Sequence, residues 1–271
     1  MKKIFLLFIT AAIMAPCLAQ EAKPNKVSRK EEKKLRIAAF AKQEEEGVIS
    51  YKKHTVFGVK LTTDGYGLFF EMFRAQSVKS GWLFQLDIAE RKHPKEAKQQ
   101  NPYDFNGSTS PIIYGKVNFF YPVKLGVQKQ LLLGNKGNKN GVSVTGNVGG
   151  GFVAGLLRPY LLEVQKDANS TGYIKFNPND TINGPGGVFI NGPIIGGPNI
   201  STGWNQLKFT PGLYLKTAAR FDFGKYNEMV NALEVGVTGE YYSKKIPQMA
   251  YNKEKQFFFS AYVAFMFGKR K

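Results

Sequence analysis

Apolar and polar residues alternate along most of the chain from His54 onward. The alternation is clearest in residues 256–268, where every second residue is apolar: Phe257, Phe259, Ala261, Val263, Phe265 and Phe267. A period of two indicates a β-strand with one apolar face. Such a strand needs an apolar partner along its full length. In a soluble sandwich that partner is a second sheet, and in a membrane barrel it is lipid.

Seven earlier segments carry the same alternation and are separated by turn-forming residues. They cover residues 54–62, 66–74, 82–91, 113–131, 142–164, 207–223 and 233–241. The sequence therefore predicts an all-β fold, an eight-stranded antiparallel up-and-down transmembrane β-barrel over residues 54–271, with ten strands as the alternative.

The lengths of the connections favour a membrane barrel over a sandwich. With a periplasmic N-terminus, the outer connections are 62–65, 92–111, 165–206 and 245–254, and the inner ones are 76–80, 134–141 and 224–229. Three of the four outer connections are longer than every inner turn. This asymmetry is typical of transmembrane barrels with both termini in the periplasm.

The second row of these strands is polar and charged. An eight-stranded barrel is only wide enough for side chains to fill it, so we expect a network of paired charges in the lumen. The predicted network contains Glu71, Asp87, Lys116, Lys216, Arg220, Asp222, Glu234 and Glu240, and the same row includes Lys60, Asn118, Lys124, Gln128 and Lys208. Such a network predicts a plugged barrel and not a pore.

Residues 165–206 interrupt the alternation and are rich in Gly, Pro and Asn. This connection is longer than an ordinary loop, so we expect it to bind a partner. Its apolar side chains are predicted to be exposed and to suit burial against another protein. They are Val188, Phe189, Ile190, Ile194 and Ile195.

Residues 1–19 have the organisation of a secretory signal peptide, with two lysines, an apolar run and small residues before a cleavage site after Ala19. Cleavage there removes Cys17, the one cysteine of the chain. We therefore expect neither a disulfide nor a reactive thiol in the mature protein.

Residues 20–53 form a separate N-terminal segment. Ser28 and Glu31 make a capping box for a charged helix, which ends at Gly47. The apolar part of this helix is short, so it can dock on another surface but cannot support a core of its own. We expect either a periplasmic lid or tether, or a solvated linker.

The formal net charge of the 271-residue chain is +18. In an exported protein, outer-membrane lipid headgroups and the phosphates of lipopolysaccharide are the expected counter-charges, and nucleic acid is not an expected partner. A basic surface that only aids solubility is the alternative. After residue 19, no segment reaches the roughly 18 uninterrupted apolar residues that a spanning helix requires.

Catalytic chemistry has few candidate residues. The chain has two histidines, His54 at the start of the first strand and His93 in an outer loop. A barrel holds these positions at opposite ends, so they cannot share a metal ion or a proton relay. His93 near Ser108 or Ser110 is the one candidate for a hydrolase at the rim. The sequence therefore predicts no catalytic residue, no cofactor and no metal site.

Three stretches resemble a family of small outer-membrane β-barrel proteins of Bacteroidota. They are FFFSAYVAFMFGKRK at the C-terminus and, further in, YGKVNFFYPVKLGVQKQLLLGNKGNKNGV and RFDFGKYNEMVNALEVGVTGEYYSKKIP. The resemblance covers residues 50–271 and implies a barrel in a Gram-negative outer membrane. The charged N-terminal helix and the basic tail after Phe267 depart from the enterobacterial eight-stranded barrels.

The terminal strand also resembles the recognition signal of the barrel-assembly machinery. The resemblance implies that its aromatic residues serve insertion: Phe257, Phe259, Phe265 and Phe267. It carries no catalytic residues across.

Three functions are compatible with these features. The favoured one is a non-enzymatic structural or accessory subunit of an envelope complex, such as a barrel-assembly or protein-export machine. A plugged lumen, a long apolar loop and a periplasmic helix all suit that role. The alternatives are a small-solute porin or transporter, which would depend on Lys116 or Arg220, and a lipid-modifying surface enzyme, which would depend on His93.

Overall fold

The computed structural model describes residues 31, 32, 34, 35, 38, 52–77, 79–100, 111–136, 141–167, 170–182, 184, 186–224 and 229–270. The chain divides into two compact units, Met1–Ala39 and Phe40–Lys271. In the first unit the described residues are helical, within the helix predicted from the sequence. The predicted signal peptide and the Ser28 cap lie outside the described residues. No helix among the described residues is long and apolar enough to cross a membrane.

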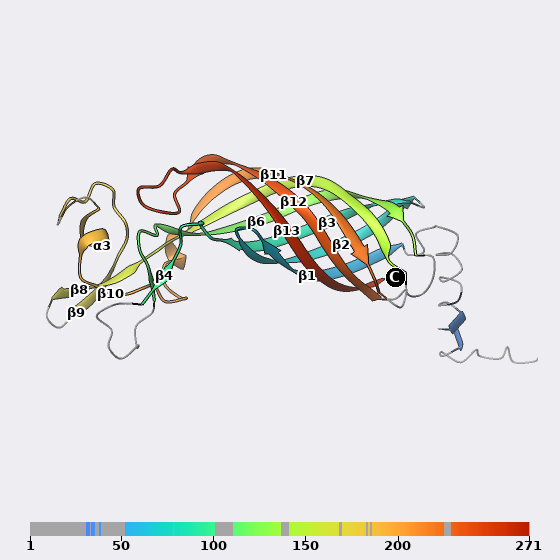
Figure 1. Ribbon diagram of the computed structural model, residues 1–271, viewed down its shortest axis with the longest axis horizontal. Helices are drawn as coiled ribbons and strands as arrows, with labels where there is room; N and C mark the ends of the chain where they lie inside the picture. The colour runs from blue at the N-terminus through green and yellow to red at the C-terminus, as the bar shows by residue number, and fades with distance from the viewer. Residues whose placement is uncertain are drawn as a thin grey trace, which may run out of the picture. The chain divides into compact units, whose positions relative to one another are not determined.

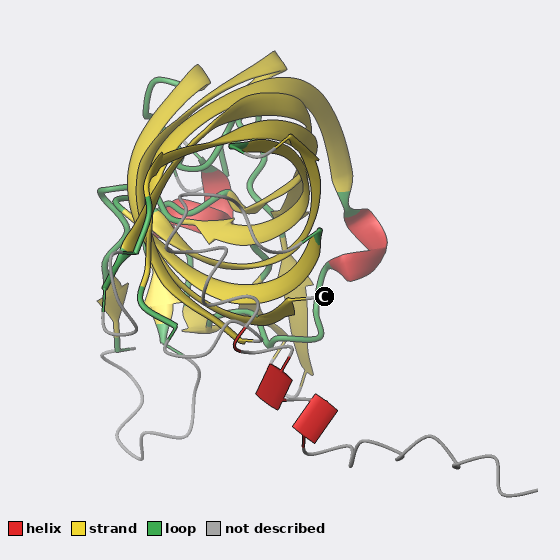
Figure 2. Cartoon of the chain, turned by 90° about the vertical axis from the view of Figure 1, so that its right-hand side faces the viewer, coloured by secondary structure: helices red, strands yellow, loops and turns green. Residues whose placement is uncertain are grey.

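The second unit is built around one closed antiparallel sheet, which confirms the predicted eight-stranded up-and-down barrel. Its strands are β1 (Lys53–Thr62), β2 (Gly65–Ser77), β3 (Ser80–Arg91), β6 (Asn118–Gly134), β7 (Ser143–Pro159), β11 (Lys208–Asp222), β12 (Met229–Ile246) and β13 (Lys255–Arg270). Each strand pairs with the next, and β13 pairs with β1, so the sheet has no free edge. Figure 1 shows the barrel from the side, and Figure 2 shows its strands as a ring.

Two barrel strands are shorter than the alternation predicts. β6 begins later, because Ile112–Ile113 forms β5 and pairs with β4 (Lys98–Gln99) outside the barrel. β7 ends at Pro159, and Leu162–Asp167 forms β8 in a second sheet. At both breaks consecutive residues are buried, among them Ile112 and Ile113 before β6 and Tyr160, Leu161 and Leu162 after β7, so the period of two is lost where the chain leaves the barrel wall.

The outward face of the barrel is apolar on every strand. We call these positions the apolar belt; they include Phe57, Val59, Leu61, Leu68, Phe70, Phe84, Leu86, Ile88, Leu125, Val127, Val148, Phe152, Leu213, Leu215, Val235, Phe257, Phe259, Val263, Phe265 and Phe267. Phe152 and Leu215 are each 74% exposed. Within β13 the residues between the belt positions are buried, as the period of two requires.

A glycine run allows β7 to approach both neighbouring strands. A Cβ atom on Gly151 would lie 2.2 Å from the carbonyl oxygen of Leu125, and one on Gly150 would lie 2.4 Å from that of Tyr214. Inside the barrel, a Cβ on Gly126 of β6 would lie 2.4 Å from the hydroxyl oxygen of Tyr214 on β11. Because Gly126 has no side chain, the Tyr214 side chain has space inside the barrel.

The connections differ in length at the two ends, although less regularly than predicted. At the end where the chain enters and leaves the barrel, which we call the terminal end, the connections are residues 78–79, 135–142 and 223–228. At the other end, residues 92–117 and 160–207 are longer than all of these, residues 247–254 only equal 135–142 in length, and residues 63–64 form a tight turn. We call the described parts of 92–117, 160–207 and 247–254 the cap.

The cap has secondary structure and a small core of its own. It contains the three-stranded sheet of β8, β9 (Ser170–Ile174) and β10 (Ile194–Gly196), the short helix α3 (Gly187–Asn191) and the 3₁₀ turn η2 (Trp204–Gln206) (Figure 1). Its core is formed by Ile112, Ile113, Tyr160, Leu162 and Phe189. Burial raises the pKa of Tyr160 to about 12, and its hydroxyl accepts a hydrogen bond from the Ile113 N–H at 2.8 Å.

Candidate functional site: the lumen and the cap

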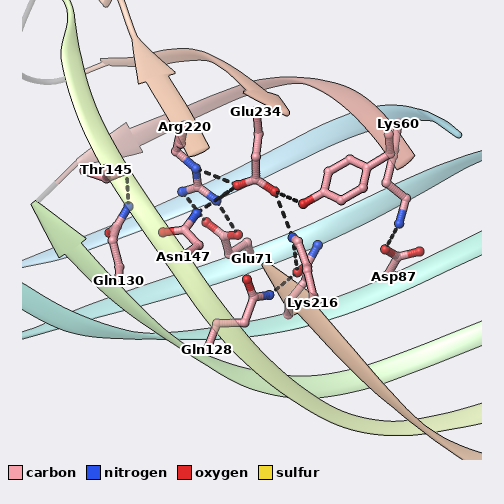
Figure 3. Close-up of polar contacts among 12 residues, drawn as sticks. Lys60, Glu71, Asp87, Gln128, Gln130, Thr145, Asn147, Lys216, Arg220 and Glu234 are labelled. Atoms are coloured by element: carbon pink, nitrogen blue, oxygen red, sulfur yellow. Dashed lines mark hydrogen bonds and ion pairs between the residues drawn. The ribbon is translucent and has the colours of Figure 1, made fainter. Parts of the chain in front are cut away.

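The middle of the lumen is organised by Arg220, which holds two carboxylates from other strands (Figure 3). Its Nη1 and Nη2 atoms donate to Glu71 Oε1 at 2.7 Å and Oε2 at 2.8 Å. Nη2 also donates to Glu234 Oε2 at 2.6 Å. The Lys216 ammonium lies 2.8 Å from Glu234 Oε1. All four side chains are buried, so the carboxylates depend on these cations for neutralisation.

Neutral groups complete this centre. Tyr262 donates its hydroxyl to Glu234 Oε1 at 2.8 Å, and Asn147 Nδ2 donates to Glu234 Oε2 at 2.9 Å. Lys216 Nζ donates to Gln85 Oε1 at 2.9 Å, and Gln128 donates to the same oxygen. These groups come from seven of the eight barrel strands, and Figure 3 shows several of the contacts that join them inside the lumen.

A second cluster lies toward the cap. Arg91 donates from Nη1 and Nη2 to the two oxygens of Glu240, at 2.8 and 3.0 Å. Lys124 Nζ lies 2.8 Å from Glu240, and the Tyr242 hydroxyl donates to it at 2.6 Å. Arg91 Nε also lies 2.6 Å from an oxygen of Asp64. Aromatic rings close this level of the lumen, with Phe120, Tyr242 and Phe258 packed together.

At the terminal end, Asp222 pairs with Arg270 and lies 3.8 Å from the Lys136 ammonium. Between the two larger clusters, Lys60 pairs with Asp87. Apolar side chains fill the space beside these pairs; they are Val56, Phe69, Val230, Ala232, Tyr262, Ala264 and Met266. Charged pairs and apolar groups therefore occupy the lumen at each of these levels.

The structure places seven of the eight predicted network residues inside the barrel, where they are buried. They are Glu71, Asp87, Lys216, Arg220, Asp222, Glu234 and Glu240. Lys116 was assigned wrongly: it is buried in the cap, where its ammonium lies 2.6 Å from Glu96. Burial lowers the pKa of Lys116, and the Glu96 carboxylate opposes that shift. Lys208 was also assigned wrongly, because it lies at the cap end of β11 and is exposed.

Among the lysines and arginines of the network, three were missed: Arg91, Lys136 and Arg270. Arg91 shares the odd parity of Gln85 and Asp87, so the period of two could have identified it. Lys136 follows β6 and reaches into the barrel from a turn, where no period applies.

The apolar side chains of the 165–206 connection, which were predicted to meet a partner, pack mainly within the cap. The prediction that they are exposed is wrong for Phe189, which is 2% exposed and lies in the core of the cap. Ile190 and Ile194 pack against that core, and Val188 and Ile195 are half-buried.

The four aromatic residues assigned to an assembly signal lie in the apolar belt. Phe257, Phe259, Phe265 and Phe267 are 60%, 63%, 47% and 58% exposed. Their role in insertion stays a prediction.

The two histidines lie at opposite ends of the barrel. His54 is buried at the terminal end, stacks on Phe73 with ring centroids 4.6 Å apart, and lies 3.5 Å from Glu71. His93 lies in the cap, and its Nδ1 accepts a hydrogen bond from the Lys95 N–H at 3.2 Å. Ser108 and Ser110 lie outside the described residues. Among the described residues, no group of His, Cys, Asp or Glu could hold a metal ion.

Two large cavities lined by described residues open beside the cap. The first has a volume of about 530 Å³ and is lined by Tyr66, Glu90, Lys92, Glu96, Lys98, Ile113, Lys116, Phe119, Tyr121, Arg158, Pro198, Ile200 and Trp204. We call it the rim cavity. The second, of about 670 Å³, is lined in part by Lys175 and Lys208. The rim cavity thus includes Lys116, which the sequence had suggested for the lumen.

No protein-family model matches this chain, and no curated protein sequence matches it. Among solved structures, it is similar to the N-terminal β-barrel domain of OprF from Pseudomonas aeruginosa, with 7% identity over 80% of this chain and 98% of that one and a TM-score of 0.35. It is also similar to Ail, the attachment invasion locus protein of Yersinia pestis, solved with the heparin analogue sucrose octasulfate. There the identity is 9% over 81% of this chain and 96% of that one, with a TM-score of 0.34.

Both likenesses are too distant to transfer a function. We therefore assign the architecture from the strand pairing of this chain alone. The resemblance to a family of Bacteroidota stays a prediction.

Proposed function

We propose that this chain is a non-enzymatic β-barrel of a Gram-negative outer membrane, with a closed lumen, that presents its cap as an accessory subunit of an envelope complex. The observation that carries the proposal is the apolar belt around a barrel filled with ion pairs. A protein in water buries its apolar face and exposes its charges, whereas this barrel does the reverse.

The belt supports a lipid environment. Large apolar side chains are exposed on all eight strands, whereas soluble monomers usually expose contiguous apolar patches of only a few hundred Å². The closed sheet satisfies the backbone hydrogen bonds internally, which hydrocarbon requires.

The filled lumen supports an anchoring role over a porin or transporter. Arg91, Arg220 and their carboxylate partners cross the interior at two levels, and a solute would have to break buried ion pairs to pass.

The cap supports a role in contacts with other envelope proteins. Several of its large apolar side chains are exposed although it has a core of its own: Tyr114, Tyr173, Ile182, Ile200 and Tyr251. These replace Phe189 as the residues that we expect to meet a partner. Cross-linking mass spectrometry in intact cells, with probes in residues 165–206 and 28–46, would identify that partner.

The proposal predicts three results for the purified mature chain. It should need detergent to remain dispersed, and on gels it should migrate differently before and after boiling, because a closed barrel resists unfolding by detergent. In planar bilayers it should show no steady conductance. A chain that disperses in plain buffer and migrates identically in both states would contradict a membrane barrel.

Steady conductance that changes with Arg220→Ala would favour the porin alternative. A deletion strain with altered lipid A, restored by the wild-type chain but not by His93→Ala, would favour the enzyme alternative.

A further inference from the structure

The rim cavity continues the apolar belt toward the cap on two adjacent strands, β2 and β3. On β2, Leu68 belongs to the belt and Tyr66 lines the cavity. On β3, Ile88 belongs to the belt and Glu90 lines the cavity. Tyr66 and Glu90 are partners in the β2–β3 pairing. The cavity therefore lies on the outside of the barrel wall, directly above the surface that we assign to lipid.

Aromatic rings with fixed orientations line this cavity. The Trp204 and Tyr121 rings stack with centroids 5.7 Å apart. The Trp204 indole N–H donates to the Ile200 carbonyl at 2.7 Å, which holds the ring, and 46% of the residue remains exposed. The Arg158 guanidinium lies 4.1 Å from the Phe119 centroid and 4.8 Å from that of Trp204. These contacts orient the aromatic rings of the wall without a ligand.

The charges of the cavity favour an anion. Lys116 and Glu96 neutralise each other at 2.6 Å, and the Glu90 carboxylate accepts the Tyr66 hydroxyl hydrogen bond at 2.6 Å. Lys92 and Lys98 line the cavity, are exposed, and form no salt bridge with a carboxylate among the described residues. Lys92 instead lies over the Tyr66 ring at 5.1 Å.

We propose that the rim cavity binds the phosphorylated sugar headgroup of a glycolipid whose acyl chains lie along Leu68, Ile88 and neighbouring belt residues. The inference rests on the proposed membrane location. Lys92 and Lys98 pair with the phosphate, and the exposed Trp204 face packs on the polarised C–H groups of a sugar ring. The volume of about 530 Å³ exceeds what a phosphate alone fills and admits a saccharide ring. Aromatic and basic side chains are also enriched at the level of the lipid headgroups, where the proposed membrane location puts this cavity.

The site is tested by native mass spectrometry of the detergent-solubilised mature chain with three probes: a diphosphorylated lipid A, phosphatidylglycerol and glucosamine 1-phosphate. We expect tightest binding of lipid A. The double variant Lys92→Ala/Lys98→Ala should bind it about tenfold more weakly, since two charge-assisted contacts are lost.

Lys175→Ala/Lys208→Ala is the matched control. It removes the same charge from the cap, but at the second cavity, and should change lipid A binding by about twofold or less.

A spectroscopic readout reports on the site directly. The chain has two tryptophans, so Trp82→Phe leaves Trp204 as the sole emitter. Its emission should change on addition of lipid A, and this change should be lost in the Lys92→Ala/Lys98→Ala background.

Equal losses in the two double variants would show unspecific charge attraction and overturn the site. Glucosamine 1-phosphate bound as tightly as lipid A would overturn the lipid occupant, and phosphatidylglycerol bound equally well would overturn the sugar. A heat-modifiable barrel that retains no lipid A would refute this inference alone, whereas a chain that needs no detergent would refute the proposed function.

Discussion

At the residue scale, the lumen depends on a few cations that each serve more than one carboxylate. Arg220 lies between Glu71 and Glu234 and is 2% exposed. Toward the cap the arrangement is reversed, because one carboxylate, that of Glu240, forms ion pairs with two cations, Arg91 and Lys124. Buried charges persist only where they are neutralised, so a cation shared by two acids is the more sensitive position.

We expect Arg220→Met to lower the free energy of unfolding by about 3–5 kcal/mol, because the buried Glu71 loses its arginine and Glu234 is left with Lys216 alone. Urea unfolding of the protein from lipid vesicles, followed by tryptophan fluorescence, measures this loss. The double variant Glu71→Gln/Arg220→Met should recover part of the stability, since Glu234 remains paired with Lys216 and Glu71 no longer carries a charge. A double variant less stable than Arg220→Met would contradict this account.

At the same scale, Gly126 is a test of packing in the lumen. Gly126→Ala would place a methyl group against the Tyr214 hydroxyl, with a Cβ distance of 2.4 Å, and should destabilise the barrel by about 1–3 kcal/mol. Gly239→Ala is the control, because its nearest neighbour lies 3.8 Å away in the Phe257 ring. The same unfolding experiment should show no loss for Gly239→Ala, and equal losses for both would refute the packing argument.

At the element scale, the barrel strands and the cap are stabilised by different contacts. The barrel strands pair around a closed ring, whereas β8, β9 and β10 form a separate sheet with its own core. Val164 faces Ile194 in that sheet, and Glu163 faces Gly196. The two ends of the cap segment 164–195 therefore lie side by side.

Replacing residues 164–195 with Asn-Gly should leave the barrel folded, because none of the lumen pairs uses a residue from this segment. The variant should keep its heat-modifiable migration, and its unfolding free energy should change by about 1 kcal/mol or less. Loss of the heat-modifiable band would show that the cap and the barrel fold as one unit.

At the scale of the whole molecule, closure joins the two ends of the barrel domain. β1 pairs with β13, so that Val59 faces Phe265, and the ring is complete only when the last strand is in place. The result is a protein with charges inside and apolar groups outside, which explains why the overall composition resembles that of a soluble chain while the arrangement does not.

The amino-acid sequence by itself determined the strands, their two faces and the unequal lengths of the connections, because a period of two is a local property that each strand carries alone. It did not determine where β6 and β7 end, so Lys116 and Lys208 were assigned to the lumen although they lie at the cap. Only the tertiary structure decided which charges meet: Arg220 and Glu71 are 149 positions apart and come together through closure of the ring. The rim cavity has the same origin, since Tyr66, Lys98 and Trp204 share a wall only once the cap has folded over the barrel.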